Sequence, residues 1–193
     1  YKAPPMSKID TPEIPTYFLA WTTTPWTLPG NVALAVKEDA DYVMILMGNK
    51  KLILAEARLD IIRDTFYEKL ALYKGRDLVG LKYEPLYSYV KYDKPAYYVA
   101  AADFVSLDDG TGIVHTAVMY GADDFELGTK LGLPKKHMVD TEGRYTAEVT
   151  PWAGMFVKDA DPKIIEDLQS RGLMYRSERI KHTYPFCWRC QTP

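Results

Sequence analysis

The side chains that could do chemistry lie in two polar segments of the sequence. One is the run of hydroxyl groups at residues 22–24, which ends a strand-like stretch. The other reads DDGTGIVHTAVMYGADDF, residues 108–125, and places His115 on a short strand and Asp124 at the start of a helix. Charge and hydrogen-bond donors converge where a strand ends and a helix begins. We therefore expect His115 and Asp124 to lie near one site.

Each of these residues also has a purely structural explanation. A single histidine on a strand often makes only structural hydrogen bonds. Acidic residues such as Asp123 and Asp124 are favoured at a helix start by capping and by the helix dipole. Threonines suit β-strands because their side chains are branched at Cβ. Taken singly, these residues leave both explanations open.

The sequence lacks several motifs of covalent and metal-dependent hydrolases. It contains no Gly-x-Ser-x-Gly elbow, no phosphate-binding loop and no His-Glu-x-x-His pair. Its cysteines do not have the context of a nucleophile. Any hydrolysis would therefore depend on a positioned water molecule and on hydroxyl or backbone donors.

The two cysteines, Cys187 and Cys190, have the spacing of half a tetrahedral zinc site. Such a site needs four ligands, and the sequence offers only His182 nearby. We expect any further ligands to come from sequence outside this chain, which begins at Tyr1 and ends just after the pair. A redox or merely structural cysteine pair is the alternative.

Composition indicates a soluble globular protein. The 193 residues are 47% apolar and 26% charged, and 24 basic against 26 acidic side chains give a net charge of −2. This balance argues against a protein held to nucleic acid mainly by its overall charge, although a local basic patch stays possible. No apolar stretch is long enough to span a membrane. We predict a cytoplasmic location and no membrane partner.

Periodicity predicts strands followed by a helix in the first part of the chain. The predicted strands are residues 17–22, 31–37, 42–47 and 51–54. The last two are joined by Gly-Asn-Lys, which is typical of a hairpin turn. Residues 55–70 switch to a helical period, with Leu59, Ile62, Phe66 and Leu70 on one face.

Two more helices are predicted further along. One begins near Ala122 and closes at Gly132, and the other has Asp161 as N-cap, Pro162 at its first position and Gly172 at its end. The fold class is α+β, dominated by antiparallel strands that form a barrel-like domain with peripheral helices. We expect a linker at 1–15, this domain at 16–180, and a returning strand or linker with half a zinc knuckle at 181–193.

Three motifs together resemble one family. They read WTTTPWTLPGN, GTGIVHTA followed by GADDF, and HTYPFCWRCQTP. In this order they closely resemble the inserted editing domain, connective peptide 1, of isoleucyl-tRNA synthetases, over residues 16–193. Valyl and leucyl enzymes tend to carry Thr-Thr-Arg-Pro-Glu-Thr or Thr-Thr-Arg-Pro-Asp-Thr, whereas this chain reads Thr-Thr-Thr-Pro-Trp-Thr. One departure is the link Val118-Met119-Tyr120, where the family usually has proline.

The resemblance implies a role for each matching residue. The catalytic strand comprises Thr22, Thr23 and Thr24, which are expected to contact the terminal adenosine and the ester. The carboxylate of Asp124 is expected to hold the α-ammonium group of the substrate. Asp123 is expected only to cap the start of the helix.

Three further residues are implied to bind substrate. His115 is expected to line the amino-acid pocket and exclude larger side chains. Asn31 lies near the same pocket. Trp26, like Trp21, supplies an apolar wall or a stacking surface, or else packs in the core.

The implied activity is hydrolysis of valine wrongly joined to tRNA(Ile), and of valyl-adenylate as a further possible substrate. Editing would need no cofactor, while the complete enzyme would use ATP outside this chain and zinc is possible there. The implied partners are the 3′-terminal aminoacyl-adenosine of tRNA(Ile) and the remainder of the synthetase. The alternatives are a valyl-type or free-standing editing domain and a non-catalytic module that binds the tRNA acceptor end.

Overall fold

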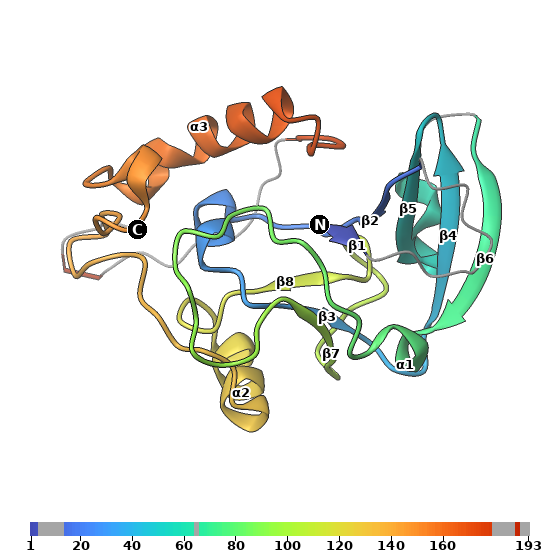
Figure 1. Cartoon of the computed structure of the whole chain (residues 1–193), viewed down its shortest axis with the longest axis horizontal. Helices are drawn as coiled ribbons and strands as arrows, with labels where there is room; N and C mark the ends of the chain where they lie inside the picture. The colour runs from blue at the N-terminus through green and yellow to red at the C-terminus, as the bar shows by residue number, and fades with distance from the viewer. Residues whose placement is uncertain (4–13, 64–65, 179–187, 190–193) are drawn as a thin grey trace.

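Two sheets form the centre of the molecule. The computed structural model describes residues 1–3, 14–63, 66–178 and 188–189, and Figure 1 shows its elements. The first sheet has the order β1 (Lys2–Ala3), β2 (Thr16–Phe18), β5 (Lys50–Ala55), β4 (Asp41–Met47) and β6 (Glu68–Lys74). Only β2 and β5 run parallel in it. The hairpin predicted at Gly-Asn-Lys joins β4 to β5 and is confirmed.

The second sheet carries His115. Its order is β7 (Tyr98–Ala101), β3 (Ala33–Val36) and β8 (Val114–Thr116). The central strand β3 is buried along its whole length, as expected for a continuous apolar run. It pairs with β7 in parallel and with β8 antiparallel, and in the latter register Leu34 lies opposite His115.

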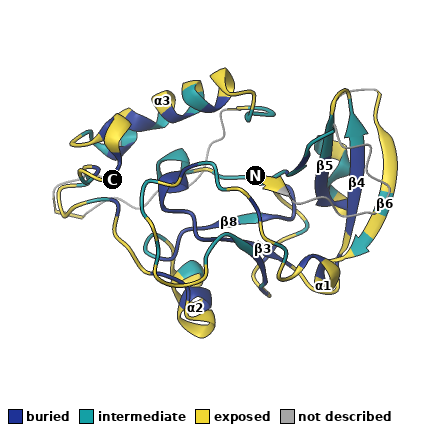
Figure 2. Cartoon of the chain, in the orientation of Figure 1, coloured by how far each residue is buried: buried dark blue, intermediate teal, exposed yellow. Residues whose placement is uncertain are grey.

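Neither sheet closes on itself among the described residues, so the strands form two open sheets rather than a closed barrel. The prediction of an α+β fold is confirmed. One core cluster contains residues of both sheets, such as Phe18, Leu34, Ile53 and Val99. Figure 2 shows this burial as dark strands at the centre of the molecule. Within the part of the chain that the structure describes, no helix is long and apolar enough to cross a membrane.

The longer helices lie on opposite sides of this centre (Figure 1). The shorter ones are α1 (Gly75–Leu78) and the 3-10 turns η1 (Pro25–Gly30), η2 (Glu56–Ile61) and η3 (Thr150–Trp152). Helix α2 (Ala122–Leu131) ends at Gly132 with φ 66°, which confirms the predicted left-handed cap. Helix α3 (Val157–Ser170) packs over η1.

The predicted start of α3 is wrong. The helix begins at Val157, and Pro162 lies inside it. Buried Val157 and Ala160 pack into the core beneath the helix, so tertiary contacts extend it beyond the proline. Asp161 does not cap this helix, because its Oδ1 accepts a hydrogen bond from the backbone N–H of Trp26 at 2.8 Å.

The predicted helix over 55–70 is also wrong. Residues 56–61 form the short turn η2, and 68–74 form the edge strand β6. In β6 the chain alternates, with Ala71 and Tyr73 against the core and Leu72 exposed by 61%. Pairing with β4 gives the backbone of β6 its hydrogen-bond partners, so the tertiary ladder overrides the weak helical period.

Candidate active site

A cavity of about 530 Å³ opens between the threonine segment, η2 and α3. Thr22, Thr23 and His115 line it, and α3 contributes Asp161. The structure therefore brings together two of the predicted threonines and the predicted histidine, although His115 follows Thr22 by more than ninety positions in the sequence. We call this the His115 cavity.

The threonine segment holds its hydroxyl groups together by a tight turn. The backbone N–H of Thr24 donates to Thr22 Oγ1 at 3.0 Å, and the Thr27 hydroxyl donates to the carbonyl of Thr24 at 2.9 Å. Pro25 then starts η1, where its fixed φ suits the first position. Thr23 is exposed on the cavity wall, so its hydroxyl can meet a ligand.

Another part of the cavity lining depends on a glycine turn. Gly110 adopts φ +62°, and a Cβ added there would lie 3.2 Å from Trp21. Its carbonyl accepts a hydrogen bond from Arg58 Nε at 3.0 Å, and Arg58 also pairs with Asp60 at 3.5 Å. Gly110 thus contacts both Arg58 and Trp21, which line the cavity.

His115 is almost completely buried and fully hydrogen-bonded. Its side chain contacts Thr27 Oγ1 through Nε2 at 3.0 Å and Asn31 Nδ2 through Nδ1 at 2.9 Å. The hydroxyl of Tyr1 also reaches Nδ1, at 3.1 Å. Burial lowers the pKa of His115 to about 3, so the ring is neutral at physiological pH.

The orientation of Asn31 determines which ring nitrogen of His115 carries the proton. Asn31 Nδ2 faces the carbonyl of Ala33 at 2.8 Å, and a carbonyl can only accept. The other amide hydrogen therefore points to Nδ1 of His115, which must accept it. The proton of the neutral ring then lies on Nε2 and is donated to Thr27.

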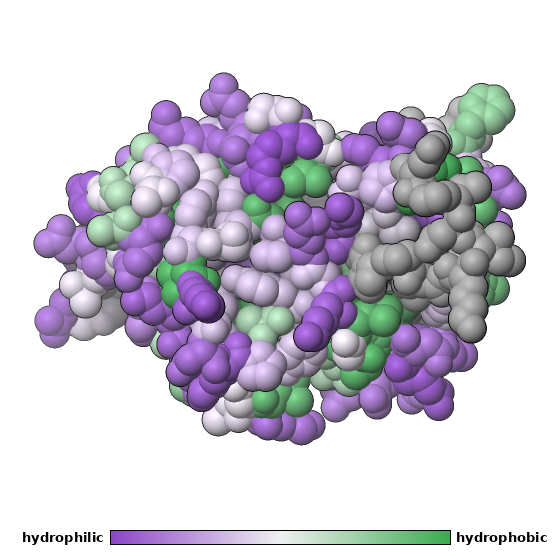
Figure 3. All heavy atoms as spheres, in the orientation of Figure 1, coloured by the Kyte–Doolittle hydropathy of each residue, from purple (hydrophilic) through white to green (hydrophobic). Residues whose placement is uncertain are grey.

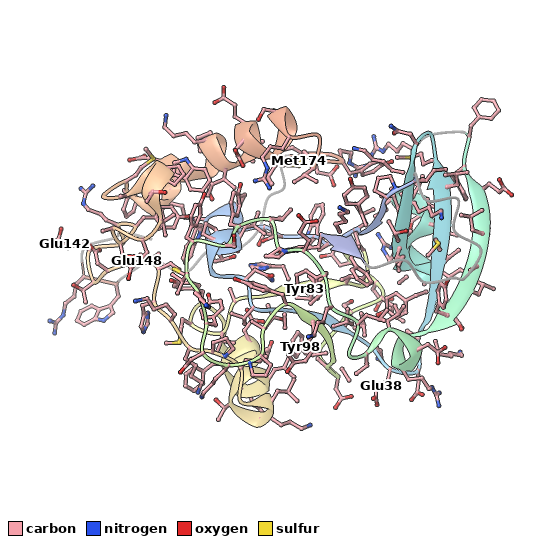
Figure 4. All side chains as sticks on the ribbon, viewed as in Figure 1. Glu38, Tyr83, Tyr98, Glu142, Glu148 and Met174 are labelled. Atoms are coloured by element: carbon pink, nitrogen blue, oxygen red, sulfur yellow. The ribbon has the colours of Figure 1, made fainter. Side chains whose placement is uncertain are left out.

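Tyr83 completes this chain of hydrogen bonds from the other end. Its hydroxyl donates to Asn31 Oδ1 at 2.6 Å, and its side chain is buried. Figure 4 shows Tyr83 in the middle of the molecule. The chain therefore runs from Tyr83 through Asn31 and His115 to Thr27, with one donor and one acceptor at each step. Hydrogen bonds therefore hold the neutral ring of His115 at both nitrogens.

Asp124 lies at the start of α2, as predicted, but outside the lining of the His115 cavity among the described residues. Its Oδ2 accepts a hydrogen bond from the backbone N–H of Ala117 at 3.1 Å, two residues after His115. Burial, and less strongly the charge of Asp123, raises the pKa of Asp124 to about 6. A carboxylate this poorly solvated gains from a cationic partner.

Trp26 packs against Tyr120 rather than lining the cavity. Their ring centroids lie 5.1 Å apart at 68°, an edge-to-face geometry that aromatic pairs favour. Tyr120 also covers Gly30, and its hydroxyl accepts a hydrogen bond from the N–H of Met138 at 2.6 Å. The departure Val118-Met119-Tyr120 thus supplies the packing partner of Trp26.

Sequence reasoning missed two members of the hydrogen-bond chain. Thr27 was visible as the fourth threonine of its segment, three residues after Thr24, a spacing at which a hydroxyl can reach back to a carbonyl within one turn. Tyr83 had no local signal, since it is one of fifteen tyrosines. Cys187 and Cys190 lie outside the described residues, and among those described no cluster of histidine, cysteine or acidic side chains could hold a metal.

Comparison with known proteins identifies the family. No protein-family model matches the chain. An isoleucine–tRNA ligase of Clostridium acetobutylicum is 51% identical over 177 residues, which cover 92% of this chain and 17% of the ligase. The ligase of Dehalococcoides mccartyi is 45% identical over 195 residues, 93% of this chain and 19% of the ligase. The chain belongs to the isoleucyl-tRNA synthetase family. It spans about a sixth of the length of the synthetases that it matches.

Solved structures place the fold among synthetase editing domains. A crystal structure described as GlLeuRS-CP1 has a TM-score of 0.70 at 17% identity, covering 88% of this chain and 87% of that one. The editing domain of the Plasmodium falciparum cytosolic leucyl-tRNA synthetase has a TM-score of 0.66 at 13% identity, covering 85% and 79%. This member of the isoleucyl-tRNA synthetase family therefore has the fold of those editing domains.

Proposed function

We propose that the chain hydrolyses the ester of valine wrongly attached to tRNA(Ile), as the editing unit of an isoleucyl-tRNA synthetase. The observation that carries the proposal is the His115 cavity, whose lining contains Thr22, Thr23 and the fixed neutral ring of His115. The family and the editing-domain fold support the same function. Valyl-adenylate is the second candidate substrate, because it presents the same aminoacyl group.

The reaction we propose is direct attack of water on the ester carbonyl. The hydroxyls of Thr22, Thr23 and Thr24 would bind the terminal ribose and orient that water. In this scheme the amino acid extends past the described lining of the cavity to Asp124, whose carboxylate would hold the α-ammonium group and align the carbonyl. The buried carboxylate favours this role, since a cationic ligand would offset its desolvation.

The same geometry supports size selection. A synthetic site that accepts isoleucine gains only about 1–3 kcal/mol against valine, a limit established for this very class of synthetase and not obtained from this chain. A second pocket that rejects the larger side chain supplies the remaining accuracy. His115 suits this role because its ring is held by bonds at both nitrogens, so it cannot rotate away from isoleucine.

The partners we propose are the aminoacylated 3′ end of tRNA(Ile) and the rest of the synthetase, in the cytoplasm. Editing needs no cofactor in this scheme, whereas ATP would be used by the synthetic site outside this chain. A zinc ion bound by Cys187 and Cys190 with ligands from elsewhere stays a prediction. Trp26 would act on substrate only indirectly, through the fold of the threonine segment, and Asn31 through His115.

The proposal is tested by deacylation of valyl-tRNA(Ile) and isoleucyl-tRNA(Ile) by the 193-residue chain. We expect hydrolysis of the valyl ester only. Asp124→Asn should lower kcat/KM by roughly 100-fold, because one charge-assisted contact is lost. Asp123→Asn is the matched control and should retain activity.

Pocket size is tested by His115→Ala with the same two substrates. We expect the preference for the valyl ester to fall roughly 10- to 200-fold, the range that a methylene-sized contact can supply. Binding of tRNA without any deacylation would mean that the chain is a non-catalytic module, and an unchanged preference would remove His115 from the sieve.

A further inference from the structure

A second cavity carries a local excess of positive charge. It has a volume of about 520 Å³ and lies between residues 90–94 and the C-terminal end of α2. Its lining includes Lys91, Lys94, Lys135 and Lys136, with Asp93 as the acidic member. The whole chain has a net charge of −2, so this surface departs from the average. We call these four lysines the lysine surface.

Two of the four lysines already have a structural partner. Lys135 donates to Thr129 Oγ1 at 2.7 Å, and its Nζ lies 3.8 Å from the centre of the Phe125 ring. Lys136 pairs with Glu148 at 2.8 Å. Lys135 also follows the end of α2, where positive charge offsets the helix dipole. These two lysines could be present for stability alone.

Lys91 and Lys94 have no such explanation. Both are exposed, both belong to a segment without regular structure, and neither forms an ion pair with another residue that the structure describes. Unpaired lysines that face a concavity are suited to a polyanion, because each can neutralise one phosphate and release its counterion.

The His115 cavity does not offer this excess. Its lining contains three arginines, Arg58, Arg63 and Arg176, against four acidic residues, which are Asp60, Asp109, Asp161 and Glu178. A tRNA whose 3′ end enters that cavity carries many more phosphates than these groups can neutralise. A second basic surface on this chain would neutralise some of the remaining phosphates.

We propose that the lysine surface binds the phosphodiester backbone of the tRNA whose aminoacylated end enters the His115 cavity. The inference rests on the proposed function, since it takes tRNA as the substrate. A protein partner fits less well, because lysine is depleted at protein interfaces, whereas lysine and arginine make most phosphate contacts. The contacts would be independent of sequence and would position the tRNA without reading its bases.

The test compares two double variants. The first carries Lys91→Gln and Lys94→Gln, and the control carries Lys37→Gln and Lys82→Gln, which remove two other exposed lysines. Figure 4 places Glu38, the neighbour of Lys37, beside α1 and far from Glu148, the partner of Lys136. Both double variants change the net charge by the same amount. Uncharged tRNA(Ile) is titrated into the 193-residue chain at several salt concentrations.

We expect the first double variant to bind tRNA roughly 10- to 30-fold more weakly at 0.15 M salt, and its slope of log K against log salt to be shallower by about 1.8. The control should retain the wild-type slope. Equal slopes in the two variants would overturn the proposal. So would unchanged tRNA binding with loss of binding to the remainder of the synthetase, which would make this a protein interface.

A short substrate separates this inference from the proposed function. Valyl-adenosine carries the same ester as valyl-tRNA but has no RNA backbone. The Lys91 and Lys94 double variant should therefore hydrolyse it at the wild-type rate, whereas its kcat/KM for valyl-tRNA should fall. If the wild type fails on both substrates, the proposed function fails, while the salt slope still decides the lysine surface. Equal losses on both substrates would contradict the proposal.

Discussion

The His115 cavity and the lysine surface treat their polar groups in opposite ways. In the first, Asn31, His115 and Thr27 are buried and each hydrogen bond fixes the donor of the next. In the second, Lys91 and Lys94 are exposed and unpaired with any described residue. Figure 3 shows hydrophilic side chains spread over much of one face of the molecule.

This difference separates two tasks. A site that measures the length of a side chain must be rigid, and buried hydrogen bonds provide rigidity at the risk of large losses when one partner is removed. A surface that attracts a polyanion needs only charge, and solvated charge costs little stability. Substitutions of similar chemical size should therefore lower the free energy of unfolding much more in the His115 cavity than at the lysine surface.

The largest effect is expected for Asn31→Ala. The change leaves the Tyr83 hydroxyl and the carbonyl of Ala33 without the Asn31 side chain, and it leaves Nδ1 of His115 with the Tyr1 hydroxyl alone. Each unsatisfied buried group costs about 1–3 kcal/mol, so we expect a loss of roughly 4 kcal/mol in the free energy of unfolding, measured in urea. Tyr83→Phe removes one hydrogen bond only and should cost about 1 kcal/mol. Equal losses for the two variants would contradict the description of these residues as one connected chain of hydrogen bonds.

An intermediate effect is expected for the pH dependence at Asp124. Its folded pKa of about 6 lies above the ordinary value of 3.8, so its contribution to stability is present below 3.8 and is lost as pH rises through 6. Asp124→Asn should abolish this loss, which amounts to up to roughly 3 kcal/mol at about 1.36 kcal/mol per pKa unit. Urea unfolding at pH 4 and pH 7.5 measures it.

Hydrolysis should depend on the same titration with the opposite sign. The carboxylate can hold an ammonium group only when it is ionised, so deacylation should rise as pH increases through about 6, where Asp124 titrates. A rate that stays flat between pH 5 and pH 7 in the wild type would contradict the role of Asp124. The Asp123→Asn variant is the control for a general charge effect.

The smallest effect is expected at the lysine surface. The double variant Lys91→Gln and Lys94→Gln should change the free energy of unfolding by less than about 0.5 kcal/mol, because neither side chain is buried or forms an ion pair with a described residue. Urea unfolding beside the Asn31→Ala variant gives the direct contrast. A loss above about 1 kcal/mol would mean that these lysines stabilise the fold and would weaken their separate role in binding tRNA.

Much of the fold and of the site could be predicted because the signals are local. Strands near 33–36, 41–47 and 50–55 follow from short apolar runs and a Gly-Asn turn, and α2 follows from its cap at Gly132. The segment 68–74 was misassigned because its alternation is short and its exposed leucines resemble a helical face. The start of α3 was misplaced because Pro162 is usually a helix-start signal, whereas here the buried first turn decides.

The sequence by itself determined the chemistry available to this protein. Its motifs contain the threonines, His115 and Asp124, and their wording points to isoleucyl rather than valyl or leucyl synthetases. These properties depend on residue type and order, which the sequence states directly.

Only the tertiary structure decided how those groups are joined. Thr27, Asn31, Tyr83 and His115 come from three distant segments, and their hydrogen bonds exist only because β3 and β8 pair and the segment around Tyr83 packs beside them. The burial that keeps His115 neutral is likewise a property of packing. The gathering of Lys91 and Lys94 beside the end of α2 follows from packing too, because no local pattern brings segments about forty residues apart to one cavity.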